Sequence, residues 1–141
     1  MIVNLQRKVK FEASALNAFA AALAATVEEV AMHHFSVAFV SDRRMKELNK
    51  LFRDKDSTTD VLSFRNEPDE FEPEKNNLGD IVISAEQAQK QASENGLTLD
   101  LEIKQLILHG VLHLCGYDHE TDRGEMNARE IELRKVLNVE G

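Results

Sequence analysis

The sequence is organised around one stretch, residues 106–119, which reads LILHGVLHLCGYDH. His109 and His113 are four residues apart, so on an α-helix both project from the same face, one above the other. Gly116 stands where such a helix would end, because glycine adopts the left-handed conformation without steric cost. The chain can therefore turn at Gly116 and bring His119 back toward the first two histidines.

Three imidazoles that converge on one point indicate a metal site. Three neutral histidines with a fourth position left open are the ligand set of a catalytic zinc site, whereas a structural site is closed by four protein ligands. The chain has only one cysteine, Cys115. The residues around the histidine pair are strongly apolar, and imidazoles buried there without partners would be costly to desolvate. We therefore predict that His109, His113 and His119 hold one Zn²⁺ ion, in preference to a cluster with a purely structural role.

The same spacing occurs in a protease motif, with one difference. The three histidines and Gly116 follow the frame of the metalloprotease motif H-E-x-x-H-x-x-G-x-x-H. Gly110 occupies the position where that motif carries its glutamate general base. Without the carboxylate, the usual activation of water for peptide cleavage is missing. This difference argues against a protease and leaves open a metal hydrolase with another substrate.

Length and composition predict one globular domain over residues 1–141, with 43% hydrophobic and 30% charged residues. No apolar run is long enough to cross a membrane, the N-terminus lacks a signal-peptide layout, and a single cysteine fits a reducing compartment, so we expect a cytoplasmic protein. The net charge of −8 argues against a general nucleic-acid binder. Residues 43–65, however, carry seven positive against four acidic residues, net +3. This segment is either a local phosphate-binding patch or an ordinary solvated helix face.

Hydrophobic periodicity and capping residues divide the chain into short strands and amphipathic helices. Strands are expected at about residues 2–5, 36–41, 61–64 and 78–83, and helices at about 14–30, 42–52, 84–96, 99–115 and 122–137. An exposed loop is expected at residues 66–78. The predicted fold is α+β, close to α/β. It has a small mixed sheet of about four strands, helices packed on the sheet, and the metal-bearing helix at the centre.

Two of these helices carry more detailed expectations. Ser84 and Gln87 form a capping box at the start of the third predicted helix, which ends at Gly96. In the last helix the apolar positions expected to face the core are Met126, Ile131, Leu133 and Val136.

The sequence resembles a known family, the YbeY endoribonucleases of bacteria, which act in ribosomal RNA maturation. The resemblance rests on residues 51–56, 59–64, 78–81 and 109–119, in the family's order and spread over about half the chain. Gly110, after the first histidine, separates this motif from the proteases. Arg65 stands where many relatives have proline.

The resemblance implies a metal, usually taken as zinc, held by His109, His113 and His119, together with a functional arginine at Arg53. It implies cleavage of single-stranded ribosomal RNA in 16S rRNA 3′ end maturation and ribosome quality control, with ribosomal particles and ribosome-associated proteins as partners. We therefore expect a metal-dependent, single-strand-selective endoribonuclease with its site in a basic-rimmed cleft. The rivals are a non-catalytic ribosome assembly factor with a structural metal, and a metal hydrolase acting on another substrate.

The remaining site residues follow from the chemistry of a phosphodiester and of a metal site. The planar guanidinium of Arg53 suits a phosphate, although pairing with a neighbouring aspartate is the commoner role of a surface arginine. Lys55 belongs to the same basic segment and is a candidate substrate contact. Asp80 and Asp118 are candidate partners of the metal-binding histidines, because such rings normally donate their second N–H to a carboxylate or carbonyl. Each aspartate has the alternative of holding only a local turn.

Glu102 lies seven residues before His109, two turns away on the same helix face. It is either a remote base or a buried partner of a lysine or arginine. Tyr117 can stack on a nucleobase, with ordinary packing as the alternative.

Overall fold

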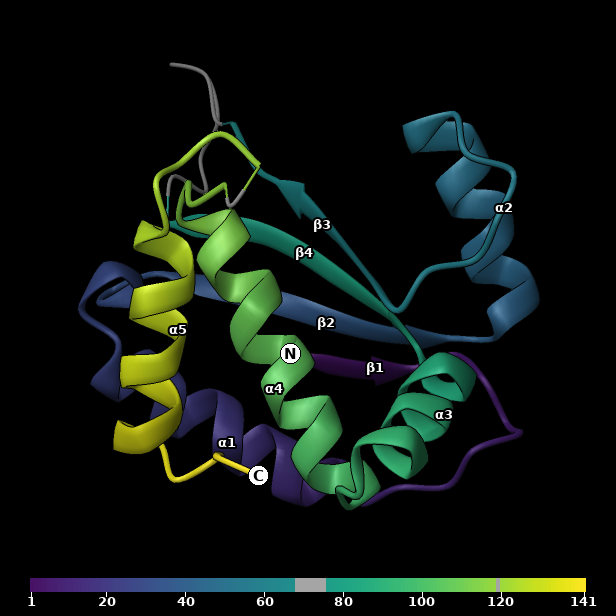
Figure 1. Ribbon diagram of the computed structural model, residues 1–141, viewed down its shortest axis with the longest axis horizontal. Coiled ribbons are helices and arrows are strands. Elements are labelled where there is room, and N and C mark those ends of the chain that lie inside the picture. Colours follow the sequence, from purple (N-terminus) through teal and green to yellow (C-terminus); the bar gives the residue numbers. More distant parts are fainter. Residues whose placement is uncertain (68–75, 119) are drawn as a thin grey trace.

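The fold is described from a computed structural model in which residues 1–67, 76–118 and 120–141 are described. In chain order the elements are β1 (Ile2–Asn4), α1 (Ala13–Thr26), a 3₁₀ helix η1 (Glu28–Val30), β2 (His34–Val40), α2 (Asp42–Arg53), β3 (Val61–Arg65), β4 (Asn77–Ser84), α3 (Ala85–Asn95), α4 (Leu99–Leu114) and α5 (Glu125–Val136). They build an α+β fold (Figure 1), which confirms the predicted fold class. No helix in the described part of the chain is long and apolar enough to cross a membrane.

The four strands form one open, mixed sheet in the order β1-β2-β4-β3. β1 and β2 are parallel, β2 and β4 are parallel, and β3 runs antiparallel to β4. Strand β3 is therefore an edge strand, with only β4 beside it. The predicted mixed sheet of about four strands is confirmed.

Side chains alternate between the two faces of the sheet, and each face is covered differently. The main core lies on the face that carries Val37, Phe39 and Ile81, which α1, α4 and α5 cover. A smaller cluster on the other face joins Leu62 of β3 to Met45 of α2. Figure 1 shows α4 crossing the sheet at the centre of the molecule and α2 standing apart at one side. The helix that carries the histidines is thus central, as predicted, and lies on the opposite face from α2.

Helix α4 lies very close to the sheet. Thr98 caps its first turn by accepting a hydrogen bond from the backbone N–H of Leu101 (3.2 Å). A Cβ atom added to Gly110 would lie 3.0 Å from the side chain of Ile81, so glycine is what allows α4 and β4 to approach this closely. Gly116 has φ of +101° and follows the last turn of the helix. The predicted helix end at Gly116 is therefore confirmed.

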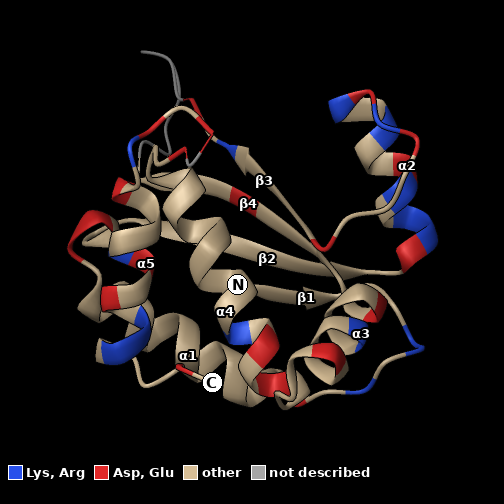
Figure 2. Cartoon of the chain, viewed as in Figure 1, with Lys and Arg blue, Asp and Glu red and all other residues tan. Residues whose placement is uncertain are grey.

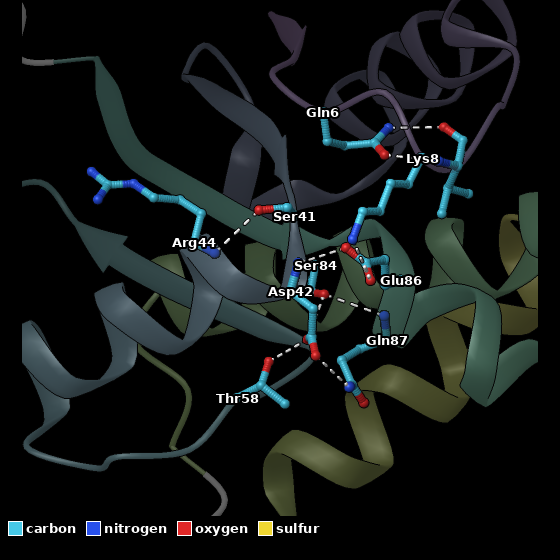
Figure 3. Close-up of polar contacts among 10 residues, drawn as sticks. Gln6, Lys8, Ser41, Asp42, Arg44, Thr58, Ser84, Glu86 and Gln87 are labelled. Atoms are coloured by element: carbon cyan, nitrogen blue, oxygen red, sulfur yellow. Dashed lines mark hydrogen bonds and ion pairs between the residues drawn. The ribbon is translucent and has the colours of Figure 1, made fainter.

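A polar network fixes the start of α2 and the loop after it (Figure 3). The carboxylate of Asp42 accepts hydrogen bonds from Thr58, from Ser84 (3.0 Å) and from the side chain of Gln87 (3.2 Å). Asn49 donates to the backbone carbonyl of residue 57 (2.9 Å). The loop that carries Lys55 is therefore tied to α2 and to the end of β4.

The capping box predicted for α3 is only half formed. Ser84 accepts a hydrogen bond from the backbone N–H of Gln87 (3.2 Å), as expected. The Gln87 side chain binds Asp42 instead of returning to Ser84, because α2 begins beside this turn.

The inward face predicted for α5 is partly wrong. Met126 and Leu133 are buried, but Ile131 is 47% exposed and Val136 is 60% exposed. The buried stripe includes Glu130 instead, which is only 9% exposed. The apolar pattern did not predict the buried position of Glu130, because this acidic side chain contacts a polar partner, His109, inside the protein. The loop predicted at residues 66–78 lies mostly outside the described residues.

Candidate active site

His109 and His113 meet on one face of α4, as their spacing predicts. Their Nε2 atoms lie 3.2 Å apart, and the ring centroids are 4.8 Å apart with an interplanar angle of 78°. The two rings therefore present the same nitrogen to one point in space.

Each ring is held through its other nitrogen. Nδ1 of His109 lies 2.8 Å from Oε1 of Glu130, and Nδ1 of His113 lies 3.1 Å from the backbone carbonyl of Tyr117. A carbonyl or an ionised carboxylate only accepts, so both Nδ1 atoms carry a proton, and in the neutral rings both Nε2 atoms carry a lone pair. A proton or a metal ion shared between the two Nε2 atoms would offset the repulsion of these lone pairs. The donor set therefore fits a metal ion such as Zn²⁺, which histidine binds through an unprotonated nitrogen.

The third predicted ligand, His119, lies outside the described residues. Within residues 1–67, 76–118 and 120–141, no group of three His, Cys, Asp or Glu side chains is placed to hold a metal ion. The structure therefore brings together two of the three predicted ligands, and His119 stays a prediction.

Glu130 is the site residue that the sequence analysis missed. It reaches His109 from α5, and its second oxygen lies 3.5 Å from Nη2 of Arg134. Burial raises the pKa of Glu130, but the hydrogen bond from His109 and the positive charge of Arg134 act against burial, and the pKa lies below its ordinary value. The carboxylate is therefore a stable acceptor for the histidine proton. Its position, four residues after Met126 and three before Leu133, was the available signal, since these three residues share one helix face.

The two aspartates predicted to orient the histidines are placed differently. Ile81 contacts Gly110 of α4, so its strand neighbour Asp80 projects from the opposite face of the sheet, away from α4. The structure therefore separates Asp80 from the histidines. Asp118 lies in the same cleft as the histidines, and its Oδ1 accepts a hydrogen bond from the backbone N–H of Glu120 (3.0 Å).

A cleft of about 680 Å³ opens beside the two histidines. Its walls are formed by Arg53, Lys55, Asp60, Val61, Ser63, Arg65, His109, His113, Gly116, Tyr117, Asp118 and Glu120. Arg53 reaches it from the last turn of α2, Lys55 from the loop after α2, and Arg65 from the edge strand β3. Figure 2 shows that Lys and Arg residues recur along α2. The structure thus brings both predicted cationic residues to the histidines and adds a third, Arg65.

Gly116 leaves room for Arg65 in this cleft. The guanidinium atoms of Arg65 lie 3.6–3.7 Å from the position that a Cβ of residue 116 would occupy. A side chain at residue 116 would therefore contact this group, in addition to the strain at a φ of +101°.

The turn after α4 is anchored from the far side by Tyr117. Its hydroxyl donates a hydrogen bond to Glu29 (2.8 Å), and Arg129 donates two more to the same carboxylate (2.9 and 2.6 Å). These bonds, from Arg129 first and then Tyr117, hold the pKa of Glu29 at about 2. The backbone carbonyl of Tyr117 is therefore fixed where His113 needs its acceptor. The hydroxyl contact supports the packing role for this tyrosine.

Comparison with known proteins agrees with the resemblance seen in the sequence. The family Endoribonuclease YbeY matches residues 1–138. The Endoribonuclease YbeY of Nautilia profundicola is 55% identical over 98 residues, which cover 70% of this chain and 68% of that protein. The Endoribonuclease YbeY of Koribacter versatilis is 50% identical over 103 residues, which cover 73% of this chain and 64% of that protein.

The fold is shared as well. The solution structure of TM1509 from Thermotoga maritima superimposes with a TM-score of 0.66 at 29% sequence identity, over 97% of this chain and 89% of that one. The match over nearly the whole chain confirms the family prediction: this chain belongs to the YbeY family of endoribonucleases.

Proposed function

We propose that this chain is a metal-dependent, single-strand-selective endoribonuclease that acts on ribosomal RNA, in 16S rRNA 3′ end maturation and ribosome quality control. One observation carries the catalytic part of the proposal. Two histidines with paired Nε2 atoms share a cleft with three cationic side chains, from Arg53, Lys55 and Arg65. The endoribonuclease names of the relatives support the reaction, and the family resemblance of the sequence supports the ribosomal substrate.

His109 and His113 would hold the metal ion through their Nε2 atoms, with His119 as the third ligand. Glu130 and the Tyr117 carbonyl keep both rings in the required tautomer and orientation. A zinc ion bound there supplies Lewis-acid stabilisation of the charge that develops on a phosphodiester.

The cationic residues of the cleft bind the RNA backbone. The guanidinium groups of Arg53 and Arg65 can each donate two parallel hydrogen bonds to phosphate oxygens, and Lys55 adds a point charge. Asp60, Asp118 and Glu120 line the same cleft and repel phosphate. A phosphate is therefore favoured only beside the cations, which restricts where the scissile bond lies.

The nucleophile is either water or the RNA 2′-hydroxyl, and the products distinguish them. Attack by the 2′-hydroxyl on phosphorus expels the 5′-oxygen of the next nucleotide and leaves a 2′,3′-cyclic phosphate. Attack by water leaves no cyclic phosphate. Mass spectrometry of the fragments from a short single-stranded RNA identifies the route.

The central test is cleavage of matched single-stranded and double-stranded RNA by purified protein. We expect Arg53→Ala and His109→Ala to lose cleavage of the single strand while retaining a folded circular dichroism spectrum. Arg43→Ala is the matched control, since this arginine lies on the same helix with its side chain 92% exposed and does not line the cleft. Full activity in either cleft variant would remove that residue from the mechanism, and wild-type protein without nuclease activity would refute the proposed function.

A chelator separates a catalytic from a structural metal. If the ion is catalytic, its removal abolishes cleavage with little change in melting temperature. A structural ion would lower the melting temperature strongly. Incubation with ribosomal particles that contain precursor 16S rRNA, followed by mapping of the RNA 3′ ends, then tests the ribosomal substrate.

A further inference from the structure

A second cavity of about 640 Å³ adjoins the cleft and shares two residues with it, Asp60 and His109. Its walls are formed by Asp60, Gln91, Asn95, Leu97, Glu102, Gln105, Leu106, His109, Glu130, Arg134 and Gly141. The proposed mechanism uses Asp60, His109 and Glu130 of these walls and assigns no role to the others.

Helix α4 contributes residues to the walls of both cavities. Glu102, Gln105 and His109 follow one another at steps of three and four residues, so they form a polar stripe on one side of the helix. Glu102 and His109 are separated by seven residues, about 10 Å along the helix axis. A strand of RNA with its phosphate beside His109 therefore has a neighbouring nucleotide within reach of Glu102.

Two buried side chains of this cavity present acceptors to a ligand. Glu102 is 4% exposed, and its Oε1 accepts a hydrogen bond from Asn95 (3.2 Å), which orients the carboxylate. Gln105 is 8% exposed, and its Nε2 donates a hydrogen bond to the carbonyl of Val139 (2.8 Å). This bond fixes the orientation of the side-chain amide, whose oxygen is an acceptor. Burial raises the pKa of Glu102, so its carboxylate would be stabilised by N–H donors from a ligand.

Arg134 adds a donor on the same wall. Within the described chain, its Nε atom is buried and has no hydrogen-bond partner. The Arg134 side chain is 34% exposed, so the other N–H groups of its guanidinium are accessible to an acceptor on a ligand. The walls of the cavity carry the guanidinium of Arg134 and three carboxylates, from Asp60, Glu102 and Glu130. This excess of negative charge disfavours a phosphate.

We propose that this cavity binds a guanine base of the RNA next to the scissile phosphate, with Glu102 as the residue that selects it. Among the four bases, guanine alone presents two adjacent N–H donors, N1–H and N2–H, beside an acceptor, O6. The donors match the Glu102 carboxylate and the acceptor matches the guanidinium of Arg134. The proposal rests on the proposed nuclease function, because it assigns a base preference to the same reaction.

The test measures cleavage of short single-stranded RNAs that carry guanosine, inosine or adenosine at each position beside the cut. A bidentate base contact discriminates by roughly 5- to 150-fold. We expect guanosine to be preferred by a factor in this range at one position, and inosine, which lacks the 2-amino group, to lose several-fold. Glu102→Gln should bring the three rates close together. Asn95→Ala, at an exposed position, should weaken the preference without risk to folding.

Glu94→Gln is the control, because it removes the same charge from an exposed position of α3 that does not line the cavity. It should keep the guanosine preference. An equal rate for all bases in wild-type protein, or an unchanged preference in both cavity variants, would overturn the proposal.

A second measurement separates this inference from the nuclease function. Free guanosine, titrated into the protein, should shift the side-chain amide NMR signals of Asn95 and Gln91, and adenosine should not. Protein that binds guanosine but cuts no RNA would refute the proposed function alone. Protein that cuts RNA but shows no guanosine shift and no base preference would refute the guanine site alone.

Discussion

Replacement of Glu130 tests whether the contact between α5 and α4 prepares the histidine pair for a metal ion. The Glu130 side chain is 11% exposed and accepts the Nδ1 proton of His109 at 2.8 Å, while the His109 side chain is 31% exposed. In Glu130→Ala the ring keeps a polar N–H in a partly buried place with no acceptor. It can then rotate, or move its proton to Nε2, and either change removes the lone pair aimed at the metal.

The expected loss of metal affinity follows from the role of a carboxylate that accepts a hydrogen bond from a metal-binding histidine. Loss of a hydrogen-bond partner of a metal-binding histidine typically lowers metal affinity 10- to 100-fold, which is about 1.4–2.8 kcal/mol. Glu130→Gln should lose less than Glu130→Ala, because an amide oxygen still accepts the proton although the charge is gone. We expect the affinity order wild type, then Gln, then Ala.

Zinc affinity is measured by competition with a chromophoric chelator, alongside the free energy of unfolding in urea. Glu132→Ala is the matched control, since Glu132 lies two residues further along α5 with its side chain 63% exposed. Equal zinc affinity in wild type and Glu130→Ala would refute the reasoning, and so would an equal loss in Glu132→Ala. Wild-type protein that binds no zinc would instead refute the metal proposal itself.

Three further predictions concern the fold around the site. Gly110→Ala should lower the free energy of unfolding by about 1–3 kcal/mol, because the added Cβ would lie 3.0 Å from the Ile81 side chain. Urea denaturation measures this loss, and the double variant with Ile81→Ala should recover part of it. Asp42→Ala removes three accepted hydrogen bonds, so denaturation should show a loss of about 2–4 kcal/mol, and RNA cleavage should fall because the loop after α2 loosens. The pKa of Glu29 falls from 4.5 to about 2 on folding, so its pairing with Arg129 stabilises the protein by up to about 3 kcal/mol above pH 4.5. That contribution should disappear as the pH falls toward 2, and Glu29→Gln should flatten the pH dependence of thermal stability in this range; an unchanged slope would contradict the assignment.

Much of the framework was predictable because its determinants are local. The four-residue spacing of His109 and His113, the turn at Gly116 and the cap at Thr98 each act within one or two turns of one helix. Strand and helix periodicity likewise placed the four strands and their order along the chain. Such patterns are visible in sequence because the residues that interact are close neighbours in the chain.

The partners of the site were decided by contacts between distant segments. Glu130 is 21 residues from His109 in the chain, so its contact with that ring depends on how α5 packs against α4. Asp80 was a candidate partner of the histidines, but its neighbour Ile81 faces Gly110 of α4, so Asp80 points to the other face of the sheet. Helix packing is set by the whole core. Spacing along the chain could place Glu130 on the face of α5 that carries Met126 and Leu133, but it could not pair Glu130 with His109.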